Sequence, residues 1–390
     1  MIPGTRAGLR RSLMMVTGIF HSPGGVAAVN RLVIHALGQA GYQVDVYALN
    51  EIDPEPDARY IDPALVACRC FQENKPAYAL AVWGSVLKTR YDLIIVDHVN
   101  VASVLAPLSL LGMGHYVVWL CGVEVFPPRP DFEGRIGLKH AWRRLAISDF
   151  TRQSVQTGFP DLPIEVCELA LDPVQHRLAS GEELAAHGPA PVWLEAVSGA
   201  QHRLGHLIIL TVGRMSTAEQ YKGQDTLLRA FPAIRQRFSK AQLVLVGSGD
   251  DLPRLLALAR SLPGAAQQAV FMPGYVDDGT LDALYRQSVV FAMPSTGEGF
   301  GLVYLEAMSR GKPCVGGKLD ATPGVVQDGI TGALVDDPRS SEQLAAAIMG
   351  LMADPERARQ MGLAGYRRVQ STYLFMHFQK RFWEALGVSP

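Results

Sequence analysis

The sequence predicts an α/β protein built from two doubly wound parallel sheets, and three observations support this prediction. Short apolar segments alternate with helical stretches through the first half of the chain. The alternation fades between about residues 171 and 203, where polar and small residues dominate, and it restarts at Leu207. A chain of 390 residues is also longer than one hydrophobic core ordinarily supports.

In the first half, the expected strands are short and apolar, as buried parallel strands are. They cover residues 13–20, 43–49, 93–97 and 116–120. A glycine pair separates the first of these strands from a helix expected over residues 26–39. Gly112 and Gly114 divide the apolar stretch 101–120 into a helix and a strand, each too short to cross a bilayer.

The second half repeats this plan. Strands are expected over residues 207–212, 243–246, 270–272, 289–293 and 314–316, with a last, aromatic-rich helix over 373–386. The domain organisation that follows comprises an N-terminal domain of residues 1–175, a linker region of 176–205, a C-terminal domain of 206–372 and a terminal helix of 373–390 that packs back on the first domain.

Composition excludes several classes of protein. A formal net charge of −1 gives no global attraction to nucleic acid. Five cysteines without a paired CxxC argue against a metal knuckle or a disulfide framework and favour a reducing, cytoplasmic compartment. The short apolar run after Arg11 lacks a cleavage site and is interpreted as a strand. The basic stretch from Arg129 to Arg152 is a candidate for peripheral contact with the inner face of a membrane, although a solvated helix face is the commoner explanation.

The most informative stretch is residues 295–311, which read STGEGFGLVYLEAMSRG. It follows an apolar segment closed by proline, so we expect a strand, a glycine-bearing loop and a helix. Gly299 and Gly301 allow the backbone to approach a ligand, and amides at a helix start favour an anion such as a diphosphate. Glu298 in the loop and Glu306 in the helix offer carboxylates to sugar hydroxyls. An ordinary acidic helix start explains neither the glycines nor the second glutamate.

This segment resembles the E-x7-E signature of the retaining glycosyltransferases of family 4, which have the GT-B fold. The resemblance implies two Rossmann-like domains facing across a cleft, with a C-terminal helix crossing back to the first domain. It implies that Glu298 is catalytic and holds the donor sugar, and that Glu306 binds the ribose. The other donor-binding residues that it implies in this segment are Gly299, Phe300, Gly301 and Leu302.

Two cations lie near the first strand of the second half. Arg214 follows Gly213 at the end of this strand, and Lys222 precedes the next helix. Such a group suits a diphosphate, and the family resemblance gives Arg214 and Lys222 catalytic roles in neutralising the leaving diphosphate. A solvated lysine and arginine beside a loop is the alternative. The resemblance also implies donor-binding roles for Gly213, for the turn residue Gly247, and for Gly274, Tyr275 and Val276 around the base.

In the first half, the resemblance is patchier. Gly24 and Gly25 resemble a glycine-rich loop on the acceptor or phosphate side, and a plain strand-to-helix turn is an equal alternative. Residues 119–124 resemble the family's HGxE segment, with Cys121 at the histidine position and Glu124 at the glutamate position. A thiol does not supply the hydrogen bond of an imidazole, so the role of the Cys121 side chain stays open. Ser148 is expected to cap a helix.

The function implied by the resemblance is retaining transfer of a hexose from a UDP- or GDP-linked sugar to a glycan or lipid-linked acceptor in cell-surface polysaccharide or glycoconjugate biosynthesis. It implies no metal and no cofactor besides the donor substrate. Two alternatives remain, and both bind a nucleotide: an oxidoreductase or a GT-B-fold epimerase that needs no acceptor, and a non-catalytic nucleotide-sugar binder suggested only by Cys121. Mannose, glucose, galactose and N-acetylglucosamine donors share these motifs.

Overall fold

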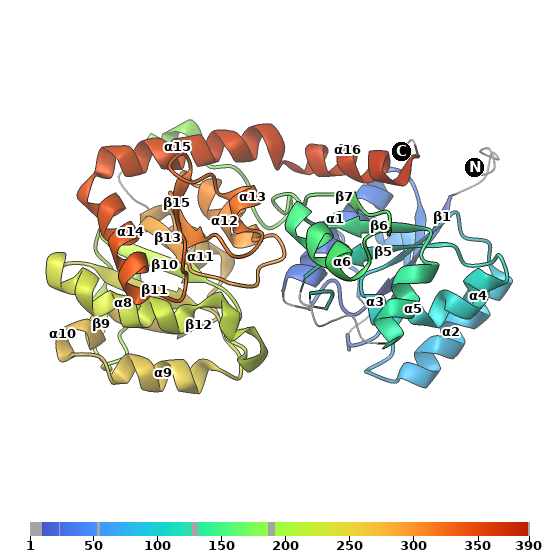
Figure 1. Cartoon of the computed structure of the whole chain (residues 1–390), viewed down its shortest axis with the longest axis horizontal. Helices are drawn as coiled ribbons and strands as arrows, with labels where there is room; N and C mark the ends of the chain where they lie inside the picture. The colour runs from blue at the N-terminus through green and yellow to red at the C-terminus, as the bar shows by residue number, and fades with distance from the viewer. Residues whose placement is uncertain are drawn as a thin grey trace. The chain divides into compact units, whose positions relative to one another are not determined.

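The computed structural model describes residues 10–22, 24–52, 55–122, 124–126, 132–185 and 192–388. The chain divides into two compact units, Met1–Val174 with Phe375–Pro390, and Gln175–Leu374. Each unit has its own parallel sheet with helices and its own hydrophobic core (Figure 1). The predicted fold class, with two Rossmann-like sheets, is confirmed.

The first unit is built on a seven-stranded sheet in the order β3-β2-β1-β4-β5-β6-β7, in which all neighbouring strands are parallel. The strands are β1 (Arg11–Val16), β2 (Gln43–Ala48), β3 (Val66–Cys70), β4 (Leu93–Val96), β5 (Tyr116–Leu120), β6 (Arg143–Ala146) and β7 (Glu165–Val166). The sequence anticipated the apolar strands β1, β2, β4 and β5. It missed β3, β6 and β7, because they are polar at one end or only two residues long.

The helices of the first unit are α1 (Gly25–Gln39), α2 (Lys75–Lys88), α3 (Val99–Ala102), α4 (Ala106–Leu110), α5 (Phe132–His140), α6 (Asp149–Gly158) and α16 (Phe375–Leu386), with 3-10 turns at Pro63–Leu65 and Ser103–Leu105. Ser148 caps α6 as expected, since its hydroxyl accepts a hydrogen bond from the Thr151 amide at 3.0 Å. Gly112 and Gly114 both have positive φ between α4 and β5, where the sequence predicted a break.

Helix α16 packs within the first unit although the second unit precedes it in the chain. Trp119 of β5 is fully buried and stacks on Phe378 and Phe382, with ring centroids 6.3 and 6.1 Å away. Trp383 stacks on Tyr42 at 6.0 Å, at the end of α1. The aromatic pattern of the terminal helix therefore serves core packing of the first unit.

The second unit is built on a six-stranded parallel sheet in the order β12-β11-β10-β13-β14-β15. The strands are β10 (Ile208–Val212), β11 (Gln242–Val246), β12 (Val270–Gly274), β13 (Ser288–Met293), β14 (Cys314–Gly317) and β15 (Gly332–Val335). All but β15 were anticipated from the sequence. The strand order reverses between β10 and β13, and in open sheets of this kind ligands bind beyond the carboxyl ends of the strands at such a switch point.

The helices of the second unit are α7 (Gly181–Ala185), α8 (Gln224–Arg237), α9 (Leu252–Arg260), α10 (Gly264–Gln267), α11 (Asp278–Gln287), α12 (Leu302–Met308), α13 (Thr322–Val325), α14 (Ser341–Ala353) and α15 (Pro355–Thr372), with a 3-10 turn at Thr217–Lys222. Apolar side chains of α8, α9 and α14 pack on one another and on β10, β11 and β13 to form the core. This core anchors the strands whose carboxyl ends carry the candidate site.

Residues 176–205, where the sequence predicts a linker, differ from that expectation, because they group with the second unit. They contain α7 and an antiparallel hairpin of β8 (Trp193–Glu195) and β9 (Gln201–Arg203). The amide of Val197 donates to the carbonyl of Val270 at 2.9 Å, so the turn of this separate hairpin is joined to β12 at the edge of the six-stranded sheet. Strands of three residues are too short to give a readable alternation.

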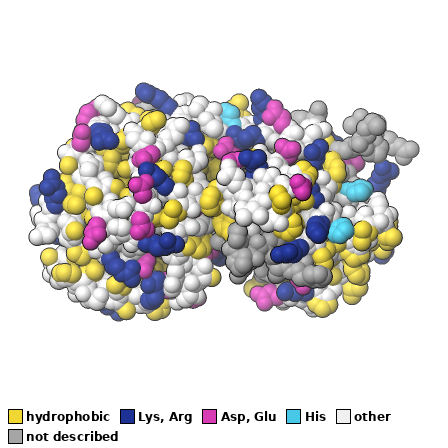
Figure 2. All heavy atoms as spheres, viewed as in Figure 1, with side chains coloured by type: hydrophobic (Ala, Val, Ile, Leu, Met, Phe, Trp, Pro, Cys, Tyr) yellow, Lys and Arg dark blue, Asp and Glu magenta, His cyan; other side chains and the backbone are white. Residues whose placement is uncertain are grey.

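Charged side chains of both signs are interspersed on the face that Figure 2 draws, in keeping with the net charge of −1. Within the predicted basic stretch 129–152, Arg144 lies in β6 and is buried, and its Nε donates to the Leu138 carbonyl at 2.6 Å, so this side chain adds no charge to the surface. Arg152 pairs with Asp149 at 2.5 Å, and Arg129 lies outside the described residues. Among the described helices, none is long and apolar enough to span a membrane.

Candidate functional site at the carboxyl edge of the second sheet

The candidate site begins where β10 and β13 end side by side. Strand β10 delivers Gly213 and Arg214, and β13 delivers the loop that contains Glu298. A hydrogen bond from the Thr296 amide to the Tyr221 carbonyl, 2.9 Å, joins this loop to the segment that carries Lys222. Three residues predicted to be catalytic from separate motifs are thus brought to one edge of the sheet.

Both cations are organised by a residue that the sequence analysis did not single out, Glu219. Arg214 is hydrogen-bonded to one carboxylate oxygen of Glu219, and Lys222 Nζ lies 3.2 Å from the other. The hydrogen bond with Glu219 raises the pKa of Arg214. Burial raises the pKa of Glu219, but Arg214 and Lys222 outweigh it and the net pKa is lowered. Glu219 therefore holds both cations in place and stays ionised.

Lys222 also lies beside the first glutamate of the signature. Its Nζ is 3.9 Å from Glu298 Oε1, and both side chains are less than one-fifth exposed. Gly223, which follows, has φ of 72°, and a Cβ there would lie 2.5 Å from the Pro294 carbonyl oxygen. Only glycine allows this approach of the two segments, and the approach sets the distance between Lys222 and Glu298.

Glu298 is held through its backbone. Its amide donates to Asp320 Oδ2 at 2.8 Å, and its carbonyl accepts from the Ala321 amide at 3.1 Å. Burial raises the pKa of Glu298; Lys222 lowers it, while the nearby Asp320 and Glu219 raise it further, and the net pKa is raised. A carboxylate in this setting gains from every hydrogen-bond donor that a ligand brings, such as a sugar hydroxyl.

The glycine-rich part of the signature turns the chain into α12. Gly301 has φ of 97° and precedes the helix, and a Cβ there would lie 2.6 Å from the Tyr304 ring. Leu302 is the first residue of α12, and Gly299 lies in the loop. The side chain of Phe300 is buried against Tyr373, with ring centroids 5.9 Å apart. A contact between Phe300 and a donor would therefore have to come from its backbone.

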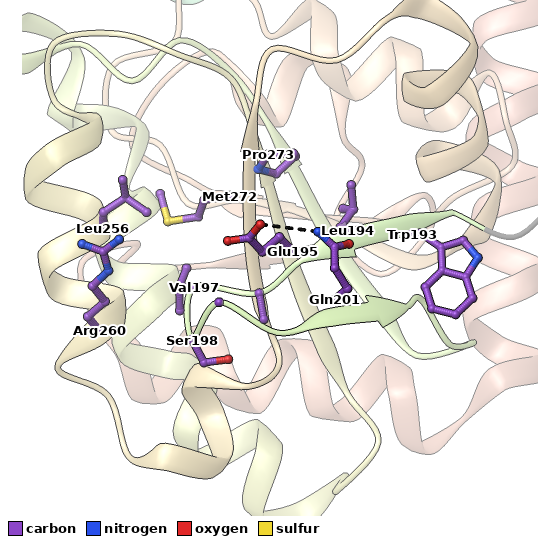
Figure 3. A pocket seen from close by; sticks show the side chains of 12 residues that line it. Trp193, Leu194, Glu195, Val197, Ser198, Gln201, Leu256, Arg260, Met272 and Pro273 are labelled. Carbon is purple, nitrogen blue, oxygen red and sulfur yellow. Dashed lines mark hydrogen bonds between the residues drawn. The ribbon is translucent and has the colours of Figure 1, made fainter.

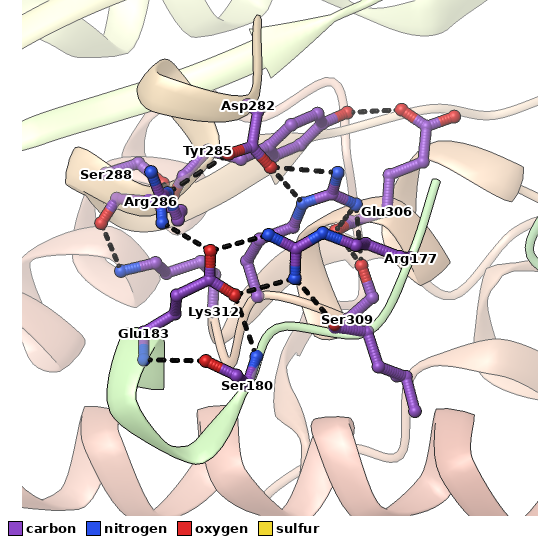
Figure 4. Close-up of polar contacts among 12 residues, drawn as sticks. Arg177, Ser180, Glu183, Asp282, Tyr285, Arg286, Ser288, Glu306, Ser309 and Lys312 are labelled. Carbon is purple, nitrogen blue, oxygen red and sulfur yellow. Dashed lines mark hydrogen bonds and ion pairs between the residues drawn. The ribbon is translucent and has the colours of Figure 1, made fainter. Parts of the chain in front are cut away.

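Glu306, the second glutamate, lies in α12 with both carboxylate oxygens engaged by the protein. The Tyr285 hydroxyl donates to Oε2 at 2.7 Å, and His176 Nε2 lies 3.4 Å from Oε1. Burial raises the pKa of Glu306, but His176, Tyr285 and Arg310 together lower it to about 2. Figure 4 shows Glu306 next to Tyr285. Neither His176 nor Tyr285 was found by sequence reasoning, since no motif connects them to the signature.

The remaining predicted donor-binding residues lie at the carboxyl ends of the adjacent strands β11 and β12. The Gly247 amide donates to the Gly274 carbonyl at 2.9 Å, and Gly247 has φ of 141°. A Cβ on Gly247 would lie 2.0 Å from the Gly213 carbonyl oxygen, so glycine is required where these turns meet. Tyr275 is 80% exposed, and Val276 is half-buried beside it.

The predicted residues of the first unit are organised in the same way, at the carboxyl ends of its own strands. Gly24 has φ of 104° at the start of α1. The loop before it is held by buried Glu51, which accepts hydrogen bonds from the amides of Ile19, His21 and Ser22 at 3.2, 2.7 and 3.2 Å. Glu51 was not anticipated from the sequence. Gly25 is the first residue of α1 and is exposed.

Cys121 and Glu124 form a tight turn after β5. Glu124 Oε1 accepts hydrogen bonds from the amides of Cys121 and Gly122 at 2.5 and 3.0 Å. The Cys121 thiol lies 3.9 Å from the Asp97 carbonyl oxygen, and burial raises the pKa of this thiol well above its usual range. Glu124 thus shapes the backbone around Cys121, which stays a neutral thiol. Val123, between them, lies outside the described residues.

A cavity of about 610 Å³ lies elsewhere in the second unit, along the β8–β9 hairpin (Figure 3). Glu195 and Gln201 line it and are joined by a hydrogen bond of 3.4 Å from the Gln201 amide. Its described lining residues include none of the predicted site residues. Within the described parts of the chain, no group of three or more His, Cys, Asp or Glu side chains is arranged to hold a metal ion.

Comparison with known proteins agrees with this geometry. Residues 198–368, which span the sheet edge described above, match glycosyl transferases group 1. The second unit belongs to this family. Among individual proteins, the chain is similar to a GDP-mannose-dependent alpha-(1-6)-phosphatidylinositol monomannoside mannosyltransferase of Mycolicibacterium smegmatis. The two are 40% identical over 151 residues, which cover 37% of this chain and 39% of that protein. It is 32% identical over 231 residues to a phosphatidyl-myo-inositol mannosyltransferase of the same organism, covering 58% of this chain and 51% of that protein.

The alignments therefore span about two-fifths to one-half of the length of these curated relatives. A likeness in structure extends over both units. The sucrose-phosphate synthase of Thermosynechococcus elongatus superposes with a TM-score of 0.75, covering 97% of this chain and 98% of the other, at 20% identity. At that identity the likeness shows the fold alone, and it supports the GT-B fold predicted for this chain.

Proposed function

We propose that this protein is a glycosyltransferase that transfers mannose from GDP-mannose to a phosphatidylinositol-derived glycolipid. The family of the second unit supports glycosyl transfer, and the two mannosyltransferase relatives support the donor and the class of acceptor. The observation that carries the proposal is the place of Lys222 at the carboxyl edge of the sheet, 3.9 Å from Glu298. A cation fixed against a carboxylate suits a substrate in which a sugar is joined to a diphosphate.

In the proposed reaction, the bond between the mannose C1 and the diphosphate oxygen breaks, and a bond from C1 to the acceptor hydroxyl oxygen forms. The hydroxyl proton passes to the leaving phosphate oxygen. Arg214 and Lys222 stabilise the charge that develops on the diphosphate, because Glu219 holds both side chains in advance of the reaction. Retention of configuration and independence of a metal are parts of the proposal that come from the family resemblance.

The two glutamates divide the recognition of the donor. Glu298 accepts hydrogen bonds from hydroxyls of the transferred sugar, and its pKa, raised by burial, is lowered when such donors arrive. Glu306 accepts from the ribose, and it is held ionised for this purpose by His176 and Tyr285. Because only Glu298 is near the reacting carbon in this arrangement, loss of each glutamate is expected to affect different kinetic constants.

The test uses the purified full chain with GDP-mannose or UDP-glucose and vesicles that contain phosphatidylinositol or its monomannoside. With GDP-mannose, and not with UDP-glucose, we expect a mannosylated lipid and an equimolar amount of GDP. EDTA should not change the yield of either product, and Glu298→Ala should form neither. Release of GDP at the same rate without acceptor, or consumption of the donor by epimerisation, would overturn the proposal. Transfer from UDP-glucose alone would keep glycosyl transfer and overturn the donor.

A further inference from the structure

Glu306 belongs to a group of side chains in the second unit whose effect on the geometry of its carboxylate goes beyond keeping it ionised. Its two carboxylate oxygens have separate partners: the Tyr285 hydroxyl on Oε2 at 2.7 Å and His176 Nε2 near Oε1 at 3.4 Å. Each carboxylate oxygen can accept more than one hydrogen bond. Two protein donors therefore fix the plane of the carboxylate and still leave acceptor capacity on both oxygens for a pair of adjacent hydroxyls.

Tyr285 is suited to this task because it is fully buried on α11 and cannot turn away. Burial and the adjacent Glu306 carboxylate raise the pKa of Tyr285 well above its usual range, so its hydroxyl remains a donor. The Arg310 guanidinium lies over the Tyr285 ring, 5.6 Å from the centroid, and fixes its position. Arg310 also donates to the Glu306 carbonyl at 3.3 Å, which couples the tyrosine to the backbone of the glutamate.

The anchoring continues away from Glu306 as a series of ion pairs, part of which Figure 4 shows. Arg310 pairs with Asp282 at 3.1 Å, and Asp282 pairs with Arg286 at 3.1 Å. Arg286 donates a hydrogen bond to Glu183 at 2.8 Å. Arg177 donates to both carboxylate oxygens of Glu183, at 2.6 and 2.7 Å.

Arg177 is the neighbour of His176 in the chain, so the series returns to its starting point. His176 contacts Glu306 directly. Arg177 is connected to Glu306 by successive contacts through Glu183, Arg286, Asp282, Arg310 and Tyr285. A closed series of this kind restrains every member from two sides. The consequence at its centre is that the Glu306 carboxylate has one orientation before any ligand arrives.

We infer that Tyr285 and His176 are positioning residues for Glu306, which orient its carboxylate toward the ribose diol and make the site select ribonucleotides over 2′-deoxyribonucleotides. The inference rests on the proposed ribose role of Glu306. Oriented acceptors favour a ligand that supplies both hydroxyls, because a missing hydroxyl leaves a buried, desolvated carboxylate with an unused lone pair. Tyr285 and His176 act through Glu306 and do not themselves touch the reacting atoms.

The experiment measures the dissociation constants of GDP and 2′-deoxy-GDP by titration calorimetry. The ratio of the two constants is expected to be about tenfold or more in the unaltered protein, the value of one hydrogen bond to a charged group. Tyr285→Phe and His176→Leu should each weaken GDP by about fivefold, leave 2′-deoxy-GDP nearly unchanged, and so reduce the ratio. His176→Gln, whose amide can replace Nε2 as a donor, should restore part of it.

Matched controls remove the same groups elsewhere in the second unit. Tyr366→Phe loses a hydroxyl that donates to the Ala179 carbonyl at 2.9 Å, and His202→Leu loses a ring that packs on Phe271 at 6.0 Å. Both should keep the ratio of the unaltered protein. With GDP-mannose, Tyr285→Phe should raise the donor KM and leave kcat within about twofold, because the ribose is bound alike in the ground and transition states.

Two outcomes would overturn the inference. An equal loss of affinity for both nucleotides in Tyr285→Phe and His176→Leu would show a general structural role, and an unchanged ratio would show no role. A Glu306→Gln variant distinguishes failure of this inference from failure of the proposed mannosyl transfer. If Glu306→Gln keeps the GDP to 2′-deoxy-GDP affinity ratio of the unaltered protein, the ribose assignment and the inference both fail. Mannosyl transfer is measured separately, as lipid product, so the proposed function is tested independently.

Discussion

Replacement of Lys222 by alanine is expected to lower kcat far more than it raises KM. Lys222 Nζ lies 3.2 Å from Glu219 Oε2 and 3.9 Å from Glu298 Oε1, with 17% of its side chain exposed. Unit charges at about 4 Å in a partly screened site interact by about 4 kcal/mol. Loss of one preorganised group that stabilises transition-state charge typically costs about 2.7–4 kcal/mol, or about 10²–10³ in kcat. We expect a loss in that range for Lys222→Ala.

The assay is the initial rate of lipid mannosylation as a function of GDP-mannose concentration. Lys222→Arg keeps the charge without the compact ammonium, so it should recover part of the rate. Lys240→Ala, which removes an exposed lysine before β11, is the matched control and should behave like the unaltered protein. A kcat within twofold of normal at saturating donor in Lys222→Ala would refute the reasoning.

Lys222→Ala should also change the dependence of the transfer rate on pH. Burial raises the pKa of Glu298, and Lys222 is the group that opposes this shift. Without Lys222 the pKa of Glu298 should rise further, so the ionised carboxylate is lost at a higher pH on acidification. The acid limb of the pH–rate profile is therefore expected to move to higher pH. An acid limb that stays in place would show that Glu298 does not need to be ionised for transfer.

Three other predictions follow from the site. Glu298→Ala should reduce turnover by about 10² or more while GDP still binds normally by calorimetry, because about 2–3 kcal/mol of charged hydrogen bonding to the sugar is lost; equal loss of GDP binding would contradict the assignment to the sugar. The pKa of Glu306 is lowered from 4.5 to about 2, so its ionised form stabilises the fold above about pH 4.5 and this stability is lost as pH falls toward 2. The melting temperature of Glu306→Gln should therefore fall less steeply between pH 5 and 3 than that of the unaltered protein. Parallel curves of melting temperature against pH would contradict this contribution of Glu306 to stability. Cys121→Ala should keep at least half of the transfer rate, since the raised pKa keeps the thiol neutral; a tenfold loss would give the thiol a role.

The fold was predictable where the sequence pattern is simple. Apolar runs such as those of β4 and β13 stand out because both faces of a parallel sheet are covered. Strand β6 begins with Arg143 and Arg144, and no apolar pattern marks it. Arg144 is nevertheless buried, because its guanidinium donates to the carbonyls of Leu138 and Lys139 at 2.6 and 3.0 Å. A buried arginine of this kind depends on tertiary contacts that a local pattern does not contain.

The sequence displays the residues predicted to face a ligand, but it does not display the residues that hold them. Glu298 and Glu306 belong to one contiguous signature, which the sequence displays directly. Glu219, Tyr285 and His176 contribute through distances set by the folded sheet, and Tyr285 is 21 residues from Glu306. Their roles depend on which strand ends lie side by side, and that order follows from topology rather than from spacing along the chain.

The place of α16 has a consequence for biosynthesis. The ribosome finishes the strands of the first unit early, yet Trp119 obtains its stacking partners Phe378 and Phe382 only after the whole second unit has been made. Until then, a large aromatic surface on the nascent first unit is uncovered, and such surfaces are where folding chains aggregate. The unit that is translated first is thus completed last, and a chain that stops before Phe375 is expected to depend on chaperones even though the sheet of its second unit is whole.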